Sequence, residues 1–234
     1  MIEIKDLTKT HKNFTALDHF SLSIKKGDCF GLLGPNGAGK STLIKILTCY
    51  WKPTSGDAMI NGVSISDPIT VKPLIGWAPQ EDSFYSGLTV MENLEYFGKL
   101  YRVKNLHERA TELLKLLGLY EKRNALSSAL SGGMKKRLNM GIALIHNPLV
   151  IFLDEPTVGV DPISRADLWN VIDAIKKQGV TILYTTHYLP EVERLCNTVG
   201  MIQQGKLIAI DTPEGLKKKY NSLEEAFVKV LGKK

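Results

Sequence analysis

The segment GPNGAGKST, residues 34–42, constrains the fold more than any other part of the sequence. It lies between a short apolar run, CFGLLG, and a run of helical character, KSTLIKILTCYW. A strand, a glycine-rich loop and a helix in this order match the pattern G-x-x-x-x-G-K-[ST], whose backbone N–H groups surround phosphate oxygens. A chance glycine loop, the alternative, does not require these flanking elements. The segment therefore predicts a phosphate site in an α/β fold.

The residue types of this loop suit a nucleoside triphosphate. The three glycines let the backbone curl without a Cβ clash, so that successive N–H groups point inward. Lys40 adds a positive charge near the β- and γ-phosphates, and the Ser41 hydroxyl can ligate Mg²⁺. The predicted nucleotide-binding residues are Gly34, Pro35, Asn36, Gly37, Ala38, Gly39, Lys40, Ser41 and Thr42.

The hydrophobic pattern places further elements around the loop. MIEIKDL and FSLSIKKGD alternate with period two and predict antiparallel strands, residues 88–147 read as mainly helical, and LVIFLDEP and VTILYTTH predict buried strands joined by a helix. A hairpin is expected in VGMIQQGKLIAI, and a last helix in SLEEAFVKVL. The prediction is a single α/β domain over 1–234, with a mostly parallel sheet, an N-terminal antiparallel β portion, a phosphate-binding core at 1–87 and 148–220, an inserted α-helical subdomain at 88–147 and a C-terminal helix at 221–234.

Composition narrows the class of protein. The chain is 44% hydrophobic and 23% charged, as globular proteins are. It has neither an apolar run of membrane-spanning length nor a signal peptide, and these two features predict a soluble cytoplasmic protein. Three scattered cysteines have no metal or redox spacing. The net charge of +6 favours solvated surface lysines over contact with nucleic acid or anionic lipid. The basic cluster near the C-terminus consists of Lys217, Lys218, Lys219, Lys233 and Lys234.

Two carboxylates follow the buried strand LVIFLDEP. Asp154 and Glu155 stand at its C-terminal end, where open α/β sheets bind ligands. Asp154 is expected to hold Mg²⁺ through water, and Glu155 to polarise an attacking water. Acids at strand ends can also cap helices, and the neighbouring Pro156 permits that alternative.

Two other polar side chains end apolar strands. His187 follows VTILYTT, and from there it can donate to a γ-phosphate and help orient Glu155 and water, although a single histidine is more often structural. Gln80 ends the strand in IGWAPQED, and its amide oxygen can complete the Mg²⁺ shell. Together with Glu155, these two residues are the predicted catalytic set.

A second anion site is predicted at LSGGM, where Ser131, Gly132 and Gly133 precede a helix expected to begin near Met134. Backbone N–H groups and the positive end of a helix dipole attract phosphate. Taken alone, the same residues read as a serine N-cap with a tight glycine turn.

In order and spacing, these motifs resemble those of ATP-binding cassette (ABC) ATPases. The resemblance covers nearly the whole chain, and LSGG followed by a strand that ends in Asp-Glu is its most specific part. It implies a second cassette subunit, identical or different, paired head to tail so that each ATP, with Mg²⁺, lies between the loop of one chain and the LSGG segment of the other. Ser131, Gly132, Gly133 and Asp161 of GVDP would contact that ATP, and His11 or Phe14 would stack on its adenine, although Phe14 can equally belong to the core.

The resemblance also implies a partner in the membrane. SGGMKKRL and PTVGVDP are similar to segments of exporter-type cassettes, whose integral-membrane permease is a separate chain. This similarity implies that the protein works on the cytoplasmic face of the membrane. It also favours export over import as the direction of transport. Phe84 and Tyr85 would anchor the permease or cover the helical core. Met134 stands at a position where this family usually has glutamine. The alternative function, a soluble cassette acting on nucleic acid or the ribosome, usually brings a coiled-coil or zinc insertion, and no nucleic-acid partner is expected.

Overall fold

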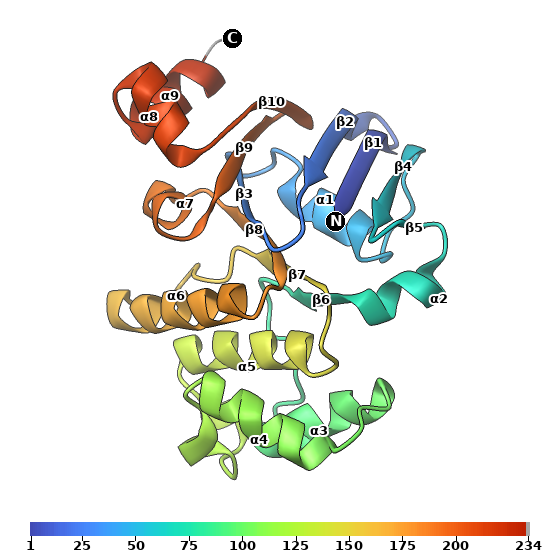
Figure 1. Cartoon of the computed structure of the whole chain (residues 1–234), viewed down its shortest axis with the longest axis vertical. Coiled ribbons are helices and arrows are strands. Elements are labelled where there is room, and N and C mark those ends of the chain that lie inside the picture. The colour runs from blue at the N-terminus through green and yellow to red at the C-terminus, as the bar shows by residue number, and fades with distance from the viewer. Residues whose placement is uncertain (233–234) are drawn as a thin grey trace. The chain divides into compact units, whose positions relative to one another are not determined.

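The computed structural model describes residues 1–232, whose elements are labelled in Figure 1. The chain divides into two units, which are described separately. The first contains Met1–Lys72 and the chain from Thr181 onward, and the second contains Pro73–Val180. Residues 233 and 234, the end of the predicted C-terminal helix and of the predicted basic cluster, lie outside the described residues.

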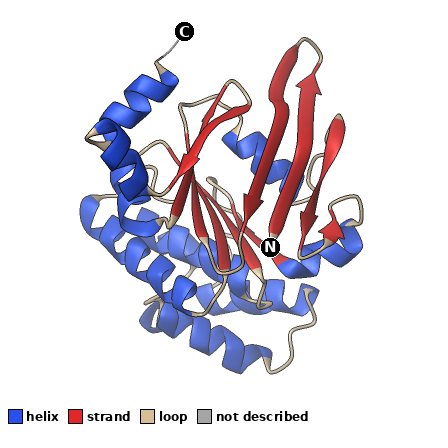
Figure 2. Ribbon diagram, turned by 45° about the horizontal axis from the view of Figure 1, so that its top comes forward, coloured by secondary structure: helices blue, strands red, loops and turns tan. Residues whose placement is uncertain are grey.

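An antiparallel sheet opens the first unit, as predicted (Figure 2). Alternating burial, with Ile2 and Ile4 inside and Glu3 outside, gives the strands one core face. Two more strands, SGDAMI and VS, were not predicted, although the Asn-Gly pair between them is typical of a hairpin turn. The sheet order is β2 (Phe14–Ile24), β1 (Ile2–His11), β4 (Ser55–Ile60) and β5 (Val63–Ser64).

Buried strands follow in the same unit. β3 (Cys29–Leu33) lies parallel to both β8 (Thr181–Thr186) and β9 (Thr198–Gln203), and β10 (Lys206–Asp211) pairs antiparallel with β9. All five residues of β3 are buried, as expected of a strand covered on both faces. The predicted parallel strands and the predicted hairpin are therefore confirmed.

The helices of the first unit are α1 (Lys40–Leu47), α2 (Pro68–Val71), α7 (Leu189–Leu195), α8 (Pro213–Tyr220) and α9 (Leu223–Leu231). α1 ends four residues before the predicted Trp51, because the Thr48 hydroxyl donates back to the Ile44 carbonyl and Cys49 turns left-handed. Three lysines of α8 and α9 pair with acidic residues, in keeping with a solvated surface. These pairs are Lys217–Glu193, Lys219–Asp211 and Lys229–Glu225.

In the second unit, β6 (Ile75–Ala78) and β7 (Val150–Asp154) pair in parallel. Gly76 of β6 lies so close to α5 (Gly132–Leu144) that a Cβ there would collide with the Ala143 carbonyl. Among residues 1–232, no helix is long and apolar enough to cross a membrane. The helices are α3 (Val90–Leu100), α4 (Leu106–Leu116), α5 (Gly132–Leu144) and α6 (Pro162–Lys177), with short 3₁₀ turns at Lys72–Leu74, Tyr120–Lys122 and Ser127–Ala129.

Candidate functional site

The glycine-rich loop leaves β3 at Gly34 and enters α1 at Lys40. Lys40 is 4% exposed, and its ammonium donates to the carbonyls of Gly34, at 2.7 Å, and of Pro35, at 3.1 Å. The Lys40 side chain thus joins the end of the loop to its start through hydrogen bonds to the backbone. A charged donor held at this point suits phosphate oxygens that approach the loop.

The three glycines of the loop have different structural roles. A Cβ on Gly34 would lie 2.4 Å from the Ile202 carbonyl oxygen, and one on Gly39 would lie 2.5 Å from that of Ala16. Gly37 has φ of 79° but no atom within 4 Å of a Cβ. Gly34 and Gly39 therefore let the loop pack closely on β9 and β2. Gly37, together with Gly39, whose φ is 111°, supplies left-handed backbone that favours glycine.

His187 lies at the same edge of the first unit as the loop. Leu33 of β3 is in register with Thr186 of β8, so the residues that follow, Gly34 and His187, leave adjacent strand ends. His187 is exposed. The Thr186 hydroxyl accepts from the Tyr188 N–H at 2.9 Å and donates to the buried Glu191 carboxylate at 2.5 Å, which fixes the turn that carries the histidine.

His11 and Phe14 face each other at the tip of the β1–β2 hairpin, where they are in register. Phe14 is 61% exposed, so the core alternative for this residue is wrong. His11 is also exposed and packs edge-on against Trp51, with ring centroids 5.1 Å apart. Both rings are therefore accessible for stacking.

In the second unit the acidic strand end and Gln80 are neighbours. Leu153 of β7 is in register with Ala78 of β6, so Asp154 and Glu155 leave the sheet beside the segment that carries Gln80. Asp154 and Glu155 are 4% and 8% exposed, and Glu155 adopts a left-handed φ of 46°. A non-glycine residue in this conformation marks a constrained turn.

Asp161, rather than Asp154 or Glu155, is the N-cap of the helix that follows β7. Its carboxylate accepts the N–H groups of Ile163 and Ser164, each at 3.0 Å, and these hydrogen bonds hold the pKa of Asp161 below its ordinary value. The helix-cap alternative for the two strand-end acids is therefore not realised.

Ser131 is the N-cap of α5, and its hydroxyl oxygen accepts the Met134 N–H at 3.3 Å. The helix begins at Gly132, two residues earlier than predicted. A Cβ on Gly133 would lie 2.5 Å from that of Ser164, so the starts of α5 and α6 lie against each other, whereas Gly132 has open space around it. The capping role of Ser131 is thus real, and the exposed Gly132 remains accessible to a ligand.

α5 also holds the segment that carries Gln80. The Lys136 ammonium donates to the Gln80 carbonyl, and partial burial lowers the pKa of Lys136. Asn139 lies off the apolar stripe of this helix, which is formed by Met134, Leu138, Ile142 and Ile145, but it is only 1% exposed. An asparagine within the apolar run RLNMGIAL was the available signal of a buried polar contact.

Aromatic residues gather next to this segment. Tyr85 packs edge-on against Tyr96 of α3, with ring centroids 4.9 Å apart, and stacks on Phe97 at 6.0 Å. Tyr85 is 50% exposed and Phe84 is half-buried, so neither is confined to the core.

The residues predicted to hold Mg²⁺ offer a hydroxyl in Ser41, a carboxylate in Asp154 and an amide oxygen in Gln80. Oxygen donors of these kinds fit this ion. Within the described chain, no cluster of three or more His, Cys, Asp or Glu side chains forms a metal site.

Comparison with known proteins yields one family. Residues 17–158 match the ABC transporter family. The chain is 41% identical over 219 residues to the linearmycin resistance ATP-binding protein LnrL of Bacillus subtilis (strain 168), covering 92% of this chain and 70% of that protein. It spans less than half the length of several other curated relatives that it matches.

Solved structures agree in fold. An ATP-binding subunit of an ABC transporter superposes with a TM-score of 0.88 at 28% identity, covering 98% of this chain and 99% of that one. A dimeric ATP-binding cassette in a post-hydrolysis state, bound to ADP and phosphate, gives 0.82 at 26% identity, covering 91% and 98%. The chain has the phosphate-loop fold of these ATPases, and it belongs to the ABC transporter family as an ATP-binding cassette.

Proposed function

We propose that this cassette pairs head to tail with a second cassette around two Mg-ATP and uses their hydrolysis to drive a separate membrane permease. In each site the phosphate loop of one subunit, with Lys40, would hold the nucleotide. Ser131 and Gly132 of the other subunit would then contact its γ-phosphate. Because ADP has no γ-phosphate, hydrolysis would remove the bridge and release the pair.

One observation carries this proposal: the chain presents two features of the kind that binds phosphate, the glycine-rich loop that ends at Lys40 and the start of α5. The phosphate loop supplies a buried lysine at the start of α1. The start of α5 presents the exposed residues Ser131 and Gly132 at the positive end of a helix of 13 residues. A triphosphate has enough charged oxygens to satisfy both features at once.

Each polar residue has a place in the proposed reaction. Glu155 accepts a proton from the attacking water, and His187 donates to the γ-phosphate. Ser41, Asp154 and Gln80 hold Mg²⁺, which when bound neutralises charge on the phosphates. Asp161 fixes the start of α6 beside Ser131. A ring at the hairpin tip, His11 or Phe14, stacks on adenine.

The partner is proposed to be an integral-membrane permease, bound through the aromatic surface formed by Phe84, Tyr85 and Tyr96. Exposed aromatic side chains are the residues that most often anchor protein interfaces. In this proposal the cassette works on the cytoplasmic face of the membrane and supports export, as the resistance protein it resembles suggests by its name.

The decisive experiment measures the solution mass of the Glu155→Gln variant with Mg-ATP, with Mg-ADP and without nucleotide. Loss of the general base should slow hydrolysis about 10²- to 10⁴-fold while leaving ATP bound. We expect a dimer only in the presence of Mg-ATP. We expect the additional substitution Ser131→Arg to abolish that dimer. A monomer in all three conditions, despite measured ATP binding, would exclude pairing of identical chains.

A further inference from the structure

The turn of the β9–β10 hairpin touches the phosphate loop directly. Gln204 and Gly205 form this turn with φ values of 49° and 78°. The Gly205 N–H donates to the Ala38 carbonyl at 2.9 Å, and the Gly205 carbonyl accepts the Asp18 N–H at 3.1 Å. A single residue outside the motif therefore joins the loop to strand β2.

Gly205 fits this place only because it has no side chain. A Cβ there would lie 2.8 Å from the Ala16 carbonyl oxygen and 2.9 Å from the Leu17 Cα. These are backbone atoms of β2, so no flexible side chain can move aside. An alanine would push the turn away from β2 and weaken the hydrogen bond to Ala38.

The same hairpin supports the loop at its other end. At the start of the loop, a Cβ on Gly34 would lie only 2.4 Å from the Ile202 carbonyl oxygen. Lys206 pairs with the Asp18 carboxylate at 3.0 Å, and that carboxylate also contacts the His19 ring at 2.6 Å. The start of the loop, its end and the neighbouring strand thus all rest on residues 202–206.

The geometry points to Gly205 as a positioning residue for nucleotide binding. It fixes the Ala38 carbonyl, and with it the end of the phosphate loop, against β2, whose tip carries Phe14. The inference rests on the proposed function of the loop. It adds that affinity for nucleotide depends on a turn far away in the sequence, which touches neither phosphate nor adenine.

The chain offers a matched control for the test. Asn61 and Gly62 form the same kind of turn between β4 and β5, with φ values of 51° and 82°, but nothing lies within 4 Å of a Cβ on Gly62. Gly205→Ala and Gly62→Ala therefore impose the same backbone strain and differ in the contact with β2. Calorimetric titration with Mg-ADP and ATPase assays on both variants isolate that contact.

We expect Gly205→Ala to raise the dissociation constant of Mg-ADP about tenfold, the effect of weakening about one hydrogen bond that holds the loop. KM for ATP should rise with it, while kcat at saturating ATP stays near the wild-type value. Gly62→Ala should bind as the wild type does. Equal affinities in the two variants would overturn the inference.

Hydrogen exchange in the wild-type chain tests the same inference without a substitution. By reciprocity, if the Gly205–Ala38 bond favours nucleotide, then Mg-ADP must slow exchange of the Gly205 N–H. The Asn61–Gly62 turn should not respond. Unchanged exchange at Gly205 while Mg-ADP is bound would reject the inference alone, whereas a wild-type chain that binds no nucleotide would reject the proposed function as well.

Discussion

The side-chain oxygen of Asn139 accepts two hydrogen bonds from Ser83, one from its backbone N–H and one from its hydroxyl, each at 3.1 Å. The Asn139 amide nitrogen donates to the Glu81 carbonyl at 2.9 Å. The helix capped by Ser131 therefore also holds the segment that follows Gln80. Within this unit, a shift of α5 has to move that segment with it or break these bonds.

Replacing Asn139 with leucine should destabilise the protein by about 1–3 kcal/mol, because the Ser83 N–H and the Glu81 carbonyl lose their partners in a partly buried place. Urea denaturation measures the change. Lys135→Met is the control, since its exposed pair with Asp82, at 3.7 Å, contributes less than about 1 kcal/mol. Equal midpoints for the two variants would show that the Asn139 contacts are not formed in solution.

Two substitutions at Ser131 separate capping from phosphate contact. Aspartate is as good an N-cap as serine, but its charge repels a γ-phosphate. Ser131→Asp should therefore keep the melting temperature and lose the ATP-dependent dimer of the Glu155→Gln background. Ser131→Ala should lower stability by about 1 kcal/mol through loss of the cap. Thermal unfolding and solution mass give both readouts, and a dimer that survives in Ser131→Asp would refute the phosphate contact.

The glycines of the phosphate loop should differ in their tolerance of alanine. Gly34→Ala places a methyl group against the Ile202 backbone, so nucleotide binding should fall below detection. Gly37→Ala meets no neighbouring atom and pays only for its left-handed φ, about 1 kcal/mol. A titration of melting temperature against Mg-ADP compares them. A Gly34→Ala variant that binds like Gly37→Ala would contradict the packing role of Gly34.

The sequence was enough to predict the loop, the parallel strands and the β9–β10 hairpin, because each follows from a local pattern of apolar residues and glycines. The Asn139–Ser83 contact could not be predicted in the same way, since 56 residues separate its partners. Gly34 and Gly39 were read as phosphate-binding glycines, but their packing against Ile202 and Ala16 depends on tertiary neighbours.

Ser131 shows a different limit of sequence reasoning. Serine followed by two glycines predicted both an N-cap and an anion site, and the cap is present. The two readings share one physical basis, unsatisfied N–H groups at the start of a helix, so no pattern in a single sequence can choose between them.

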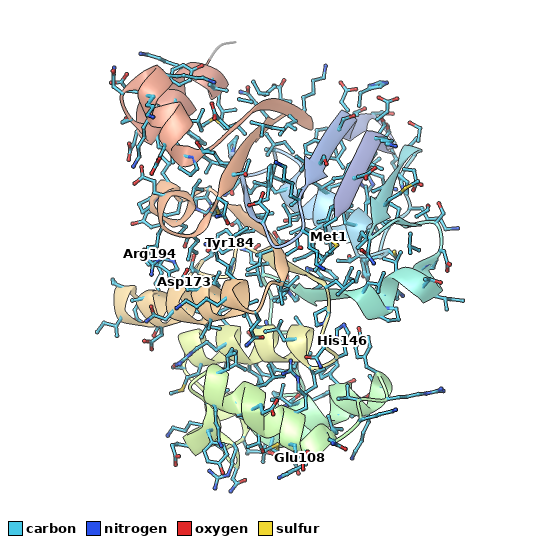
Figure 3. All side chains as sticks on the ribbon, in the orientation of Figure 1. Met1, Glu108, His146, Asp173, Tyr184 and Arg194 are labelled. Carbon is cyan, nitrogen blue, oxygen red and sulfur yellow. The ribbon has the colours of Figure 1, made fainter. Side chains whose placement is uncertain are left out.

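His146, labelled in Figure 3, should make stability depend on pH. Its ring stacks on Tyr101 with centroids 3.8 Å apart, and its Nε2 lies 2.8 Å from the Ile75 carbonyl oxygen. Nδ1 is buried and has no hydrogen-bond partner within residues 1–232. Burial lowers the pKa of His146 below its ordinary 6.5; the hydrogen bond to Ile75 opposes this shift only in part, and the charge of Arg109 adds to it.

Because its pKa is lower in the folded chain, the unfolded state binds more protons below about pH 6.5. The contribution of His146 is therefore complete above that pH and is lost as the pH falls, by at most about 1.4 kcal/mol per pH unit. Urea midpoints between about pH 7.5 and about pH 5.5 should fall less in His146→Phe, which keeps the stacked ring, than in the wild type. His19→Asn should do the opposite, since Asp18 raises the pKa of His19. Parallel pH profiles for wild type and His146→Phe would show that His146 is not the titrating group.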